Sequence, residues 1–381
     1  MAANFELKAL VEDVASTERL IDKSQVLGVE AIDQRDVYLP SQSHLVKLRY
    51  NDGKPSSVIT YQRAATPRGR PSLYEKIDVE GSQLGRRLFA ALEAVDAIGV
   101  VDKTRKVFRL ADALINLDAV EGAGNFVEIE VSAHDNDGDA AARLAFLASA
   151  LGIADHQILP YSNIHMVNIA KRAAVHRQQL LKSGGNGIFV AIDGASASGK
   201  TTLKDRLLGQ AGRHFDYALR ETTRNPRSGD ETSQDYVFVS KERFFAAALR
   251  GDYAEFRDFE FGMSYGLPWQ SFMTGVLEGR NVLGLINLGN GPYLKRICPE
   301  VVTVLLVADP EVIRSRLQAR GALLPEQIEE RVHNSMLASG YAPAYDHVID
   351  TGKVGIEDAA SLVLSLVAGG PRAARRTGRE R

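Results

Sequence analysis

A glycine-rich motif late in the chain constrains the fold more than any other feature. Residues 194–201 read GASASGKT, which matches the spacing GxxxxGKT. The apolar run IFVAID precedes the motif, and TTLKDRLLGQA, with helical spacing, follows it. Strand, glycine loop and helix in this order are typical of a P-loop, in which backbone N–H groups at the helix N-terminus hold phosphate oxygens. The sequence therefore predicts an α/β P-loop domain with a parallel sheet, and leaves about half of the chain for another unit.

The motif also predicts how ATP is held. Lys200 is expected to neutralise the β- and γ-phosphates, and the Thr201 hydroxyl is expected to bind Mg²⁺. The predicted ATP-binding residues are Gly194, Ser198, Gly199, Lys200, Thr201 and Thr202.

Composition limits the partners and the compartment. With 381 residues the chain is long enough for two domains at ~150 residues each. No apolar run approaches the ~20 residues of a membrane span, and a net charge of −2 gives no reason to expect nucleic acid or membrane binding. Cys298 is the only cysteine, so we expect a reducing cytoplasm and no cysteine-based zinc site. The basic tail at 367–381 is expected to be disordered and solvated rather than bound to RNA, and the oligomeric state is left open.

The first half is rich in predicted strands that carry charged pairs. These strands are NFELKAL, DVYLP, HLVKLRY, SVITYQRA, SLYEKIDVE, KVFRL and NFVEIEVSA. Because strand side chains alternate between faces, the members of each of the following pairs share one face. The pairs are Glu6 with Lys8, Lys47 with Arg49, Lys103 with Arg105, and Glu128 with Glu130.

Apolar helices decide where these charged faces point. Helices predicted at about 12–27, 82–97 and 141–151 would cover the apolar faces of the strands and leave the charges in a shared interior. Buried charges need partners, and a polyphosphate with Mg²⁺ or Mn²⁺ would supply them. A small-molecule nucleotide is therefore the expected ligand.

The first 170 residues resemble the CYTH family of class IV adenylyl cyclases, thiamine triphosphatases and tunnel triphosphatases. The resemblance lies in segments such as NFELKA, QRDVYL, LVKLRY, DKTRKVF and INLDAVEGAGNFVEIE. It implies an α+β domain built on an antiparallel eight-stranded tunnel barrel that binds a triphosphate. It implies Lys8 as a catalytic residue, a metal site of Glu6, Glu128 and Glu130, and a triphosphate site of Lys47, Arg49, Arg63, Lys103 and Arg105. The chain departs from the family pattern at Asn4, where a glutamate is usual, and at Leu114, where an arginine is common.

The second half resembles the guanylate kinase family. RETTRNPRSGDETSQDYVFVSKERF (220–244), GDYAEF (251–256) and SYGLPW (264–269) carry the resemblance. It implies that Arg224, Arg227 and Tyr236 hold the acceptor phosphate. Asp230 and Glu255 would face a purine edge, with Tyr265 also in the substrate site. Arg320 and Arg331 would steady the transferring phosphoryl group as catalytic residues.

Asn287 departs from this pattern, because an acidic residue is usual at that position. Together with YGLP, Asn287 also resembles ribose 1,5-bisphosphate phosphokinases of the same superfamily. The sequence therefore leaves the acceptor open between a GMP-like nucleotide and a ribose phosphate.

These observations predict four segments and a bifunctional enzyme. The segments are a CYTH-like domain at 1–170, a linker at 171–185, a guanylate-kinase-like domain at 186–366 and the tail. The predicted activities are ATP-dependent phosphoryl transfer and metal-dependent hydrolysis of a triphosphate. An adenylyl cyclase that makes cAMP, and a non-catalytic nucleotide sensor, stay as alternatives.

Overall fold

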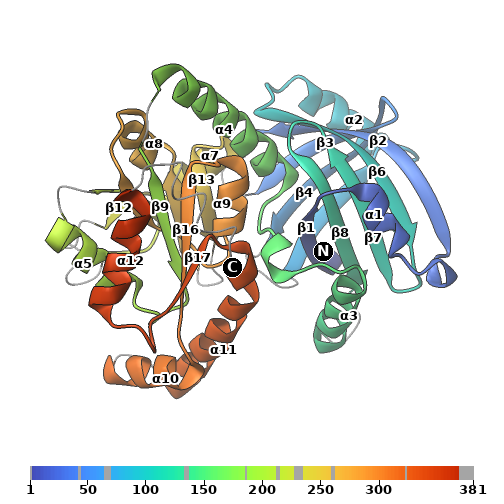
Figure 1. Cartoon of the computed structure of the whole chain (residues 1–381). Coiled ribbons are helices and arrows are strands. Elements are labelled where there is room, and N and C mark those ends of the chain that lie inside the picture. Colours follow the sequence, from blue (N-terminus) through green and yellow to red (C-terminus); the bar gives the residue numbers. More distant parts are fainter. Residues whose placement is uncertain are drawn as a thin grey trace. The chain divides into compact units, whose positions relative to one another are not determined.

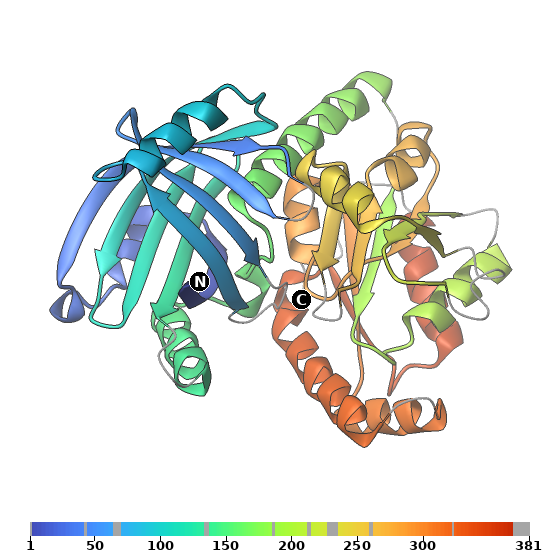
Figure 2. The same cartoon turned by 180° about the vertical axis from the view of Figure 1, so that it is seen from behind.

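The structure, a computed structural model, describes residues 2–41, 44–63, 70–132, 137–184, 187–211, 215–226, 235–258, 262–321 and 324–368. The chain divides into two compact units, drawn in Figures 1 and 2. The first comprises Met1–Arg172, Val239–Asp252 and Arg257–Ser264, and the second comprises Ala173–Phe238, Tyr253–Phe256 and Tyr265–Arg381. None of the helices within the described ranges is both long and apolar enough to cross a membrane.

The first unit is built on a closed antiparallel barrel with the strand order β1-β5-β4-β3-β2-β6-β7-β8. Its strands are β1 (Ala2–Val11), β2 (Gly28–Leu39), β3 (Leu45–Asn51), β4 (Lys54–Arg63), β5 (Arg70–Asp78), β6 (Gly99–Arg109), β7 (Ala113–Val120) and β8 (Gly124–Ser132). The predicted eight-stranded barrel is confirmed.

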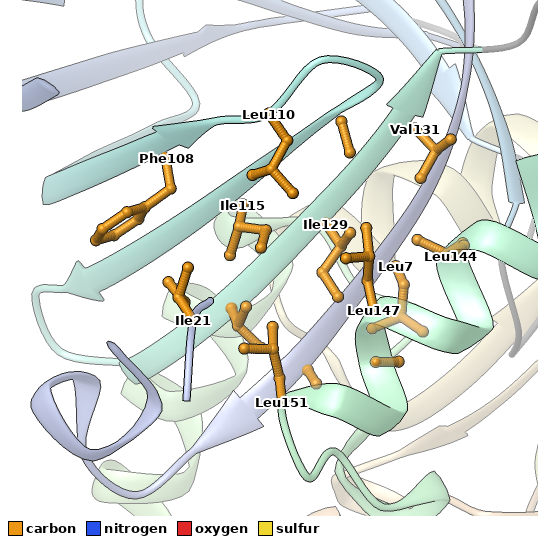
Figure 3. Packing of buried hydrophobic residues seen from close by; sticks show 14 of the residues in the cluster. Leu7, Ile21, Phe108, Leu110, Ile115, Ile129, Val131, Leu144, Leu147 and Leu151 are labelled. Carbon is orange, nitrogen blue, oxygen red and sulfur yellow. The ribbon is translucent and has the colours of Figure 1, made fainter. Parts of the chain in front are cut away.

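Helices cover the outer surface of the barrel on two sides. On one side α2 (Gln83–Glu93) packs on β3, β4 and β5, and Phe89 contacts Leu48 and Val58 there. On another side α1 (Val14–Arg19) and α3 (Asp137–Ala150) pack on β1, β7 and β8. Figure 3 shows this second apolar layer, in which Leu144, Leu147 and Leu151 meet Leu7 and Ile129. Under these helices the apolar faces of strands such as β1, β3 and β8 point outward.

Two sequence predictions in this unit differ from the structure. The helix expected at 12–27 ends at Arg19, and a separate 3-10 turn at Lys23–Gln25 follows, because the Asp22 carboxylate accepts from the Ser24 N–H and starts a new turn. Strand β7 was not among the predicted strands. Its run ALINLDAV carries a single charged residue, Asp118, so it lacks the charged pair that marked four of the other strands.

The second unit is built on a parallel five-stranded sheet with the order β10-β15-β9-β16-β17. Its strands are β10 (Asp216–Tyr217), β15 (Val282–Leu285), β9 (Phe189–Gly194), β16 (Val301–Val307) and β17 (His347–Asp350). One face packs on α5 (Lys200–Ala211) and α12 (Ile356–Ala368) through residues such as Val190 and Leu203. Phe189 points to the opposite face and stacks on Phe272 of α8 (Gln270–Leu277). The predicted parallel sheet is confirmed, with the P-loop after its central strand.

A smaller sheet, in the order β12-β11-β14-β13, carries the segments that resemble a nucleotide kinase acceptor site. Its strands are β12 (Tyr236–Phe238), β11 (Arg220–Thr222), β14 (Ser264–Pro268) and β13 (Tyr253–Asp258). The remaining elements named below are α4 (Asn163–Ser183), α7 (Lys241–Leu249), α9 (Gly291–Ile297), α10 (Pro310–Ala319) and α11 (Pro325–Tyr341). The predicted linker at 171–185 begins inside α4, and most of the basic tail lies outside the described residues.

Candidate functional sites

The predicted charged pairs lie inside the barrel. Val46 and Leu48, which alternate with Lys47 and Arg49, pack under α2, so the charged pair faces the interior. By the same alternation Leu7 and Ile129 pack outward, while Lys8 and Glu128 point inward. Among the described residues of the barrel strands, the fully or almost fully buried charges are evenly balanced. They are Lys8, Lys47, Lys103 and Arg105 against Glu6, Asp36, Asp118 and Glu128.

Two aspartates each hold one Lys-x-Arg pair. Asp36 on β2 accepts two hydrogen bonds from the Arg49 guanidinium, at 2.7 and 2.8 Å, and one from Lys47 at 2.7 Å. These cations outweigh the effect of burial and hold the pKa of Asp36 well below its usual range. Burial and the neighbouring Arg49 lower the pKa of Lys47 well below its usual value, with Asp36 opposing them. An anionic ligand beside Lys47 would favour the charged form of its ammonium group.

Asp118 on β7 repeats this arrangement with the basic pair of the neighbouring strand β6. It accepts two hydrogen bonds of 2.6 Å from Arg105 and one of 3.1 Å from Lys103. Despite complete burial, these partners hold the pKa of Asp118 below its usual value. Burial and Arg105 lower the pKa of Lys103. Each forked guanidinium is thereby fixed in orientation, as bidentate recognition of a phosphate requires.

The predicted metal ligands and Lys8 lie next to these clusters. Glu128 accepts from Arg105 at 2.6 Å, and its other oxygen lies 3.6 Å from the Lys8 ammonium. Lys8 also donates to Asn163, the first residue of α4, at 2.5 Å. Glu130 accepts from Asn116 at 2.9 Å and lies directly opposite Glu6 in the β1–β8 register. Two carboxylates, Glu6 and Glu130, therefore meet across neighbouring strands.

A cavity of about 780 Å³ is lined by residues of β2, β3, β6, β7 and β8. Gln34, Lys103 and the exposed Arg35–Asp102 ion pair, at 2.7 Å, are among the lining residues. The Gln34 side-chain oxygen and the Ser57 hydroxyl are buried and have no hydrogen-bond partner among the described residues. Arg63 is on β4, but its side chain is outside the described residues.

In the second unit the P-loop connects β9 to α5. Lys200 donates to the carbonyl of Ala195 at 2.9 Å and also to that of Gly194. Burial lowers the pKa of Lys200 to about 8, Asp193 opposes this shift, and the positive charges of Arg220 and Arg320 add to it. The buried Ser198 hydroxyl has no partner in the described part of the chain. Lys200 thus caps loop carbonyls at the position where phosphate oxygens would bind.

Arginines from α10 and α11 surround this loop. Arg316 donates to the Ala197 carbonyl at 3.2 Å and to Thr351, and Arg331 donates to the Ser196 hydroxyl at 3.4 Å. Arg320 is exposed at the end of α10. Of these three, Arg316 holds the loop, while Arg331 lies at its edge.

The acceptor residues form an aromatic and cationic wall on the smaller sheet. The Arg224 guanidinium lies over the rings of Tyr236 and Phe238, at 5.0 and 5.2 Å, and Tyr236 meets the Tyr265 ring edge-on at 5.7 Å. Glu255 is fully buried and accepts from Arg220, Asn287 and Asn290. Arg227 and Asp230 lie outside the described residues.

Two family models match the chain, one on each half. The CYTH domain model matches residues 2–159, and the guanylate kinase model matches residues 188–367. The chain carries a CYTH domain and a guanylate kinase domain.

Individual relatives are similar to parts of the chain. A guanylate kinase from Deinococcus radiodurans is 33% identical over 150 residues, which are 39% of this chain and 62% of that protein. The chain thus spans less than two thirds of that relative's length. A solved guanylate kinase from Anaplasma phagocytophilum is 22% identical and covers 49% of this chain and 86% of its own, with a TM-score of 0.38. A solved protein from Pyrococcus horikoshii is 24% identical and covers 43% of this chain and 99% of its own, with a TM-score of 0.35.

The donor set of the CYTH domain fits a hard divalent cation. Within the described residues no group of three or more His, Cys, Asp or Glu side chains is arranged to hold a metal ion. Mg²⁺ does not require such a group, since it is commonly held by one or two carboxylates together with substrate phosphates and water. Glu6 and Glu130 offer two carboxylates on adjacent strands, and Asn4 lies two residues before Glu6 on the same strand, so its position supplies no third carboxylate.

Several buried polar residues at the candidate sites were not predicted from the sequence. In the CYTH domain these are Asp36, Asp118 and Asn163, and in the guanylate kinase domain they are Asp193, Arg220 and Asn290. The alternation rule alone could have placed Asp36 on the inward face, because it precedes Tyr38 by two residues. No sequence signal pairs Arg220 or Asn290 with Glu255.

Proposed function

We propose that the guanylate kinase domain transfers the γ-phosphoryl group of ATP to a phosphate group of a small acceptor. The observation that supports this most is that one compact unit holds both the P-loop, where Lys200 donates to the carbonyls of Gly194 and Ala195, and the Arg224 guanidinium over the Tyr236 ring. This unit therefore offers a phosphate donor site and a cationic acceptor site. Nucleoside monophosphates and sugar phosphates both fit this acceptor class.

The residues of the chain would act by positioning and neutralising charge, as phosphoryl transfer requires. An oxygen of the acceptor phosphate, held by Arg224 and Tyr236, attacks the γ-phosphorus. The bond from that phosphorus to the β,γ-bridging oxygen breaks, and its electron pair stays on ADP. Lys200 moves from the carbonyls of Gly194 and Ala195 to the phosphate oxygens. Mg²⁺, when bound beside the Thr201 hydroxyl, supplies further charge neutralisation.

For the CYTH domain we propose metal-dependent hydrolysis of a triphosphate. The closed barrel brings Lys47, Arg49, Lys103 and Arg105 to one interior, and their pairs are pre-oriented by Asp36 and Asp118. Glu6 and Glu130 would hold the cation, and Lys8 would contact the phosphate chain. A water oxygen attacks the terminal phosphorus, the bond to the bridging oxygen breaks, and the proton of the water passes to solvent.

Two variants of the full chain test both proposals. Lys200→Met is expected to abolish ADP release that depends on an acceptor and to leave hydrolysis of inorganic triphosphate unchanged. Lys8→Met is expected to do the reverse. Loss of both activities in either variant would show that the two sites are not independent.

Product analysis distinguishes the alternatives for the CYTH domain. Phosphate released from triphosphate and ATP in the presence of Mg²⁺ or Mn²⁺ indicates hydrolysis, whereas cAMP formed from ATP indicates a cyclase. Calorimetric binding without any product would instead favour a nucleotide sensor.

A further inference from the structure

The carboxylate of Glu255 is fully committed within the protein. Its Oε1 accepts from Arg220 on β11 at 3.2 Å. Its Oε2 accepts from the side-chain amides of Asn287 and Asn290, at 2.7 and 2.6 Å. All four side chains are buried, and Glu255 and Asn290 are almost completely inaccessible.

This arrangement removes the group that would read a guanine base. A carboxylate recognises guanine by accepting from two neighbouring N–H groups of its edge. Here an arginine already balances the charge of Glu255, and two amides use its second oxygen. A guanine could reach Glu255 only by displacing these donors, and each displaced donor would stay buried and unsatisfied. Glu255 therefore has a structural role, because its hydrogen bonds connect β11, β13 and the segment 287–290.

The positive charge of Arg220 compensates the negative charge of the Glu255 carboxylate. Its Nε is buried and has no hydrogen-bond partner among the described residues. Its guanidinium lies over the Tyr265 ring at 5.7 Å, next to the ring of Tyr236 and hence to Arg224. The Arg220 guanidinium thus lies between the Glu255 carboxylate and the Tyr265 ring. A phosphate oxygen of an anionic ligand would give the buried Nε an acceptor, because buried donors need partners.

The two asparagines are suited to hydroxyl groups. Each uses its amide nitrogen on Glu255, which leaves the amide oxygen as the atom that can serve a ligand. An amide oxygen and the nearby tyrosine hydroxyls can accept from or donate to sugar hydroxyls.

We propose that Arg220, Asn287 and Asn290 make the acceptor site selective for a sugar phosphate that has no purine base. This inference rests on the proposed kinase function and narrows its acceptor. The transfer is the one described above: an oxygen of the sugar phosphate attacks the γ-phosphorus of ATP, ADP leaves with the bonding pair, and the product is a sugar diphosphate.

The test measures ADP release and product formation by the full chain with ATP, Mg²⁺ and one of three acceptors. The acceptors are ribose 5-phosphate, ribose 1-phosphate and GMP. A kcat/KM for one of the ribose phosphates at least tenfold above that for GMP is the expected result. A higher kcat/KM for GMP overturns the inference and leaves the proposed kinase function standing. If none of the three acceptors increases ADP release, both the inference and the proposed kinase function are overturned.

The variant Arg220→Ser examines the specificity role directly. It is expected to raise KM for the sugar phosphate at least tenfold, to leave KM for ATP within about twofold, and to improve kcat/KM for GMP because Glu255 Oε1 becomes available. A purely structural role would change both KM values together. Arg280→Ser is the matched control, since Arg280 is a half-exposed arginine of the same unit that pairs with Asp216 and Glu278 on the surface. Arg220→Lys keeps the charge and replaces Arg220→Ser if the serine variant does not fold. It is expected to raise KM for the sugar phosphate by a smaller factor and to leave GMP a poor acceptor, and an unchanged KM for both acceptors would overturn the inference.

Discussion

Asp36 and Lys47 lie side by side inside the CYTH barrel, with 2.7 Å between a carboxylate oxygen and the ammonium nitrogen. Neither group reaches solvent to any useful extent, since the Asp36 side chain is 0% exposed and the Lys47 side chain 10%. Because Asp36 also holds Arg49, one carboxylate restrains two cations that are predicted to bind phosphate. The interior is therefore organised before any ligand binds.

The first prediction concerns Asp36→Asn. Removing one partner of a buried ion pair leaves the other charge uncompensated and costs about 3–5 kcal/mol. Hydrogen exchange is measured at the β2 and β3 amides of the full chain. The free energy that protects these amides is expected to fall by this amount in the variant. Inorganic triphosphate should restore part of the protection, because a ligand that binds only the folded state stabilises it.

Asp33→Asn is the control for this experiment. Asp33 lies on the same strand, but its side chain is exposed and accepts from Thr104 on the surface. The Asp33→Asn variant should change the free energy of amide protection by less than about 0.5 kcal/mol. Equal effects of the two variants, or no response of Asp36→Asn to triphosphate, would contradict the role assigned to Asp36.

The second prediction concerns proton uptake by Lys200. The pKa of Lys200, about 8, lies below the ~10.4 of a lysine in an unfolded chain. Between these two pH values the unfolded chain therefore binds more protons than the folded one. Because of this difference, Lys200 makes the free energy of unfolding rise with pH in that range. Phosphate oxygens favour the charged ammonium, so ATP binding should raise the pKa. Calorimetry in buffers of different ionisation enthalpy is expected to show proton uptake on ATP binding that is greatest just above pH 8 and small at pH 6.5.

Lys200→Met should remove this uptake, even where residual binding persists. Uptake that is equal in the wild type and in Lys200→Met would mean that another group titrates.

A site could be predicted from the sequence where its residues lie close together along the chain. The P-loop was recognised because its glycines, Lys200 and Thr201 are contiguous and a strand and a helix flank them. The Lys47–Arg49 and Lys103–Arg105 pairs were recognised because alternation along a single strand places both members on one face. The barrel itself was predicted from the family resemblance.

Asp36, Asp118 and Arg220 were not identified because their partners belong to other strands. Asp36 meets Lys47 only through the β2–β3 register, and Arg220 meets Glu255 across 35 positions of sequence. A lone acid in a strand has no sequence feature that tells which neighbour it will face. The sequence likewise shows the Glu255 carboxylate but not the three donors that hydrogen-bond to it.

The third prediction concerns Gly289, which follows β15 with a φ of +85°. A Cβ at this position would lie 2.9–3.2 Å from the ring of Tyr341. Gly289→Ala should therefore combine the cost of a left-handed backbone with overpacking, about 2–4 kcal/mol in total. Trp269, the only tryptophan and a buried residue of the same unit, reports unfolding by fluorescence. Gly321→Ala, with a φ of +66° and open space around its Cβ, should cost only about 1 kcal/mol. If the two substitutions cost the same, contact with Tyr341 does not matter.

The last prediction separates charge from hydrogen bonding at Asp193, directly before the P-loop. Its carboxylate is fully buried, accepts from the backbone N–H groups of Gly194 at 2.6 Å and Gly289 at 3.1 Å, and also accepts from the Tyr345 hydroxyl. Burial and Asp193 raise the pKa of Tyr345 well above its usual value, so the hydroxyl remains a donor. Asp193 also supports the charged form of Lys200.

Two conservative variants separate the effect of the Asp193 charge from the effect of its hydrogen bonds. Asp193→Asn removes the charge, so the pKa of Lys200 should fall below about 8 and ATP binding at pH 8 should weaken by about 3- to 10-fold. Tyr345→Phe removes only a hydrogen bond, which should cost about 1 kcal/mol of stability and leave the pH dependence of ATP binding unchanged. The measurement is the ATP dissociation constant from pH 6.5 to 9. Parallel pH profiles for Asp193→Asn and the wild type would show that Asp193 acts only as a structural anchor, because a charge that governs Lys200 must shift the profile toward lower pH.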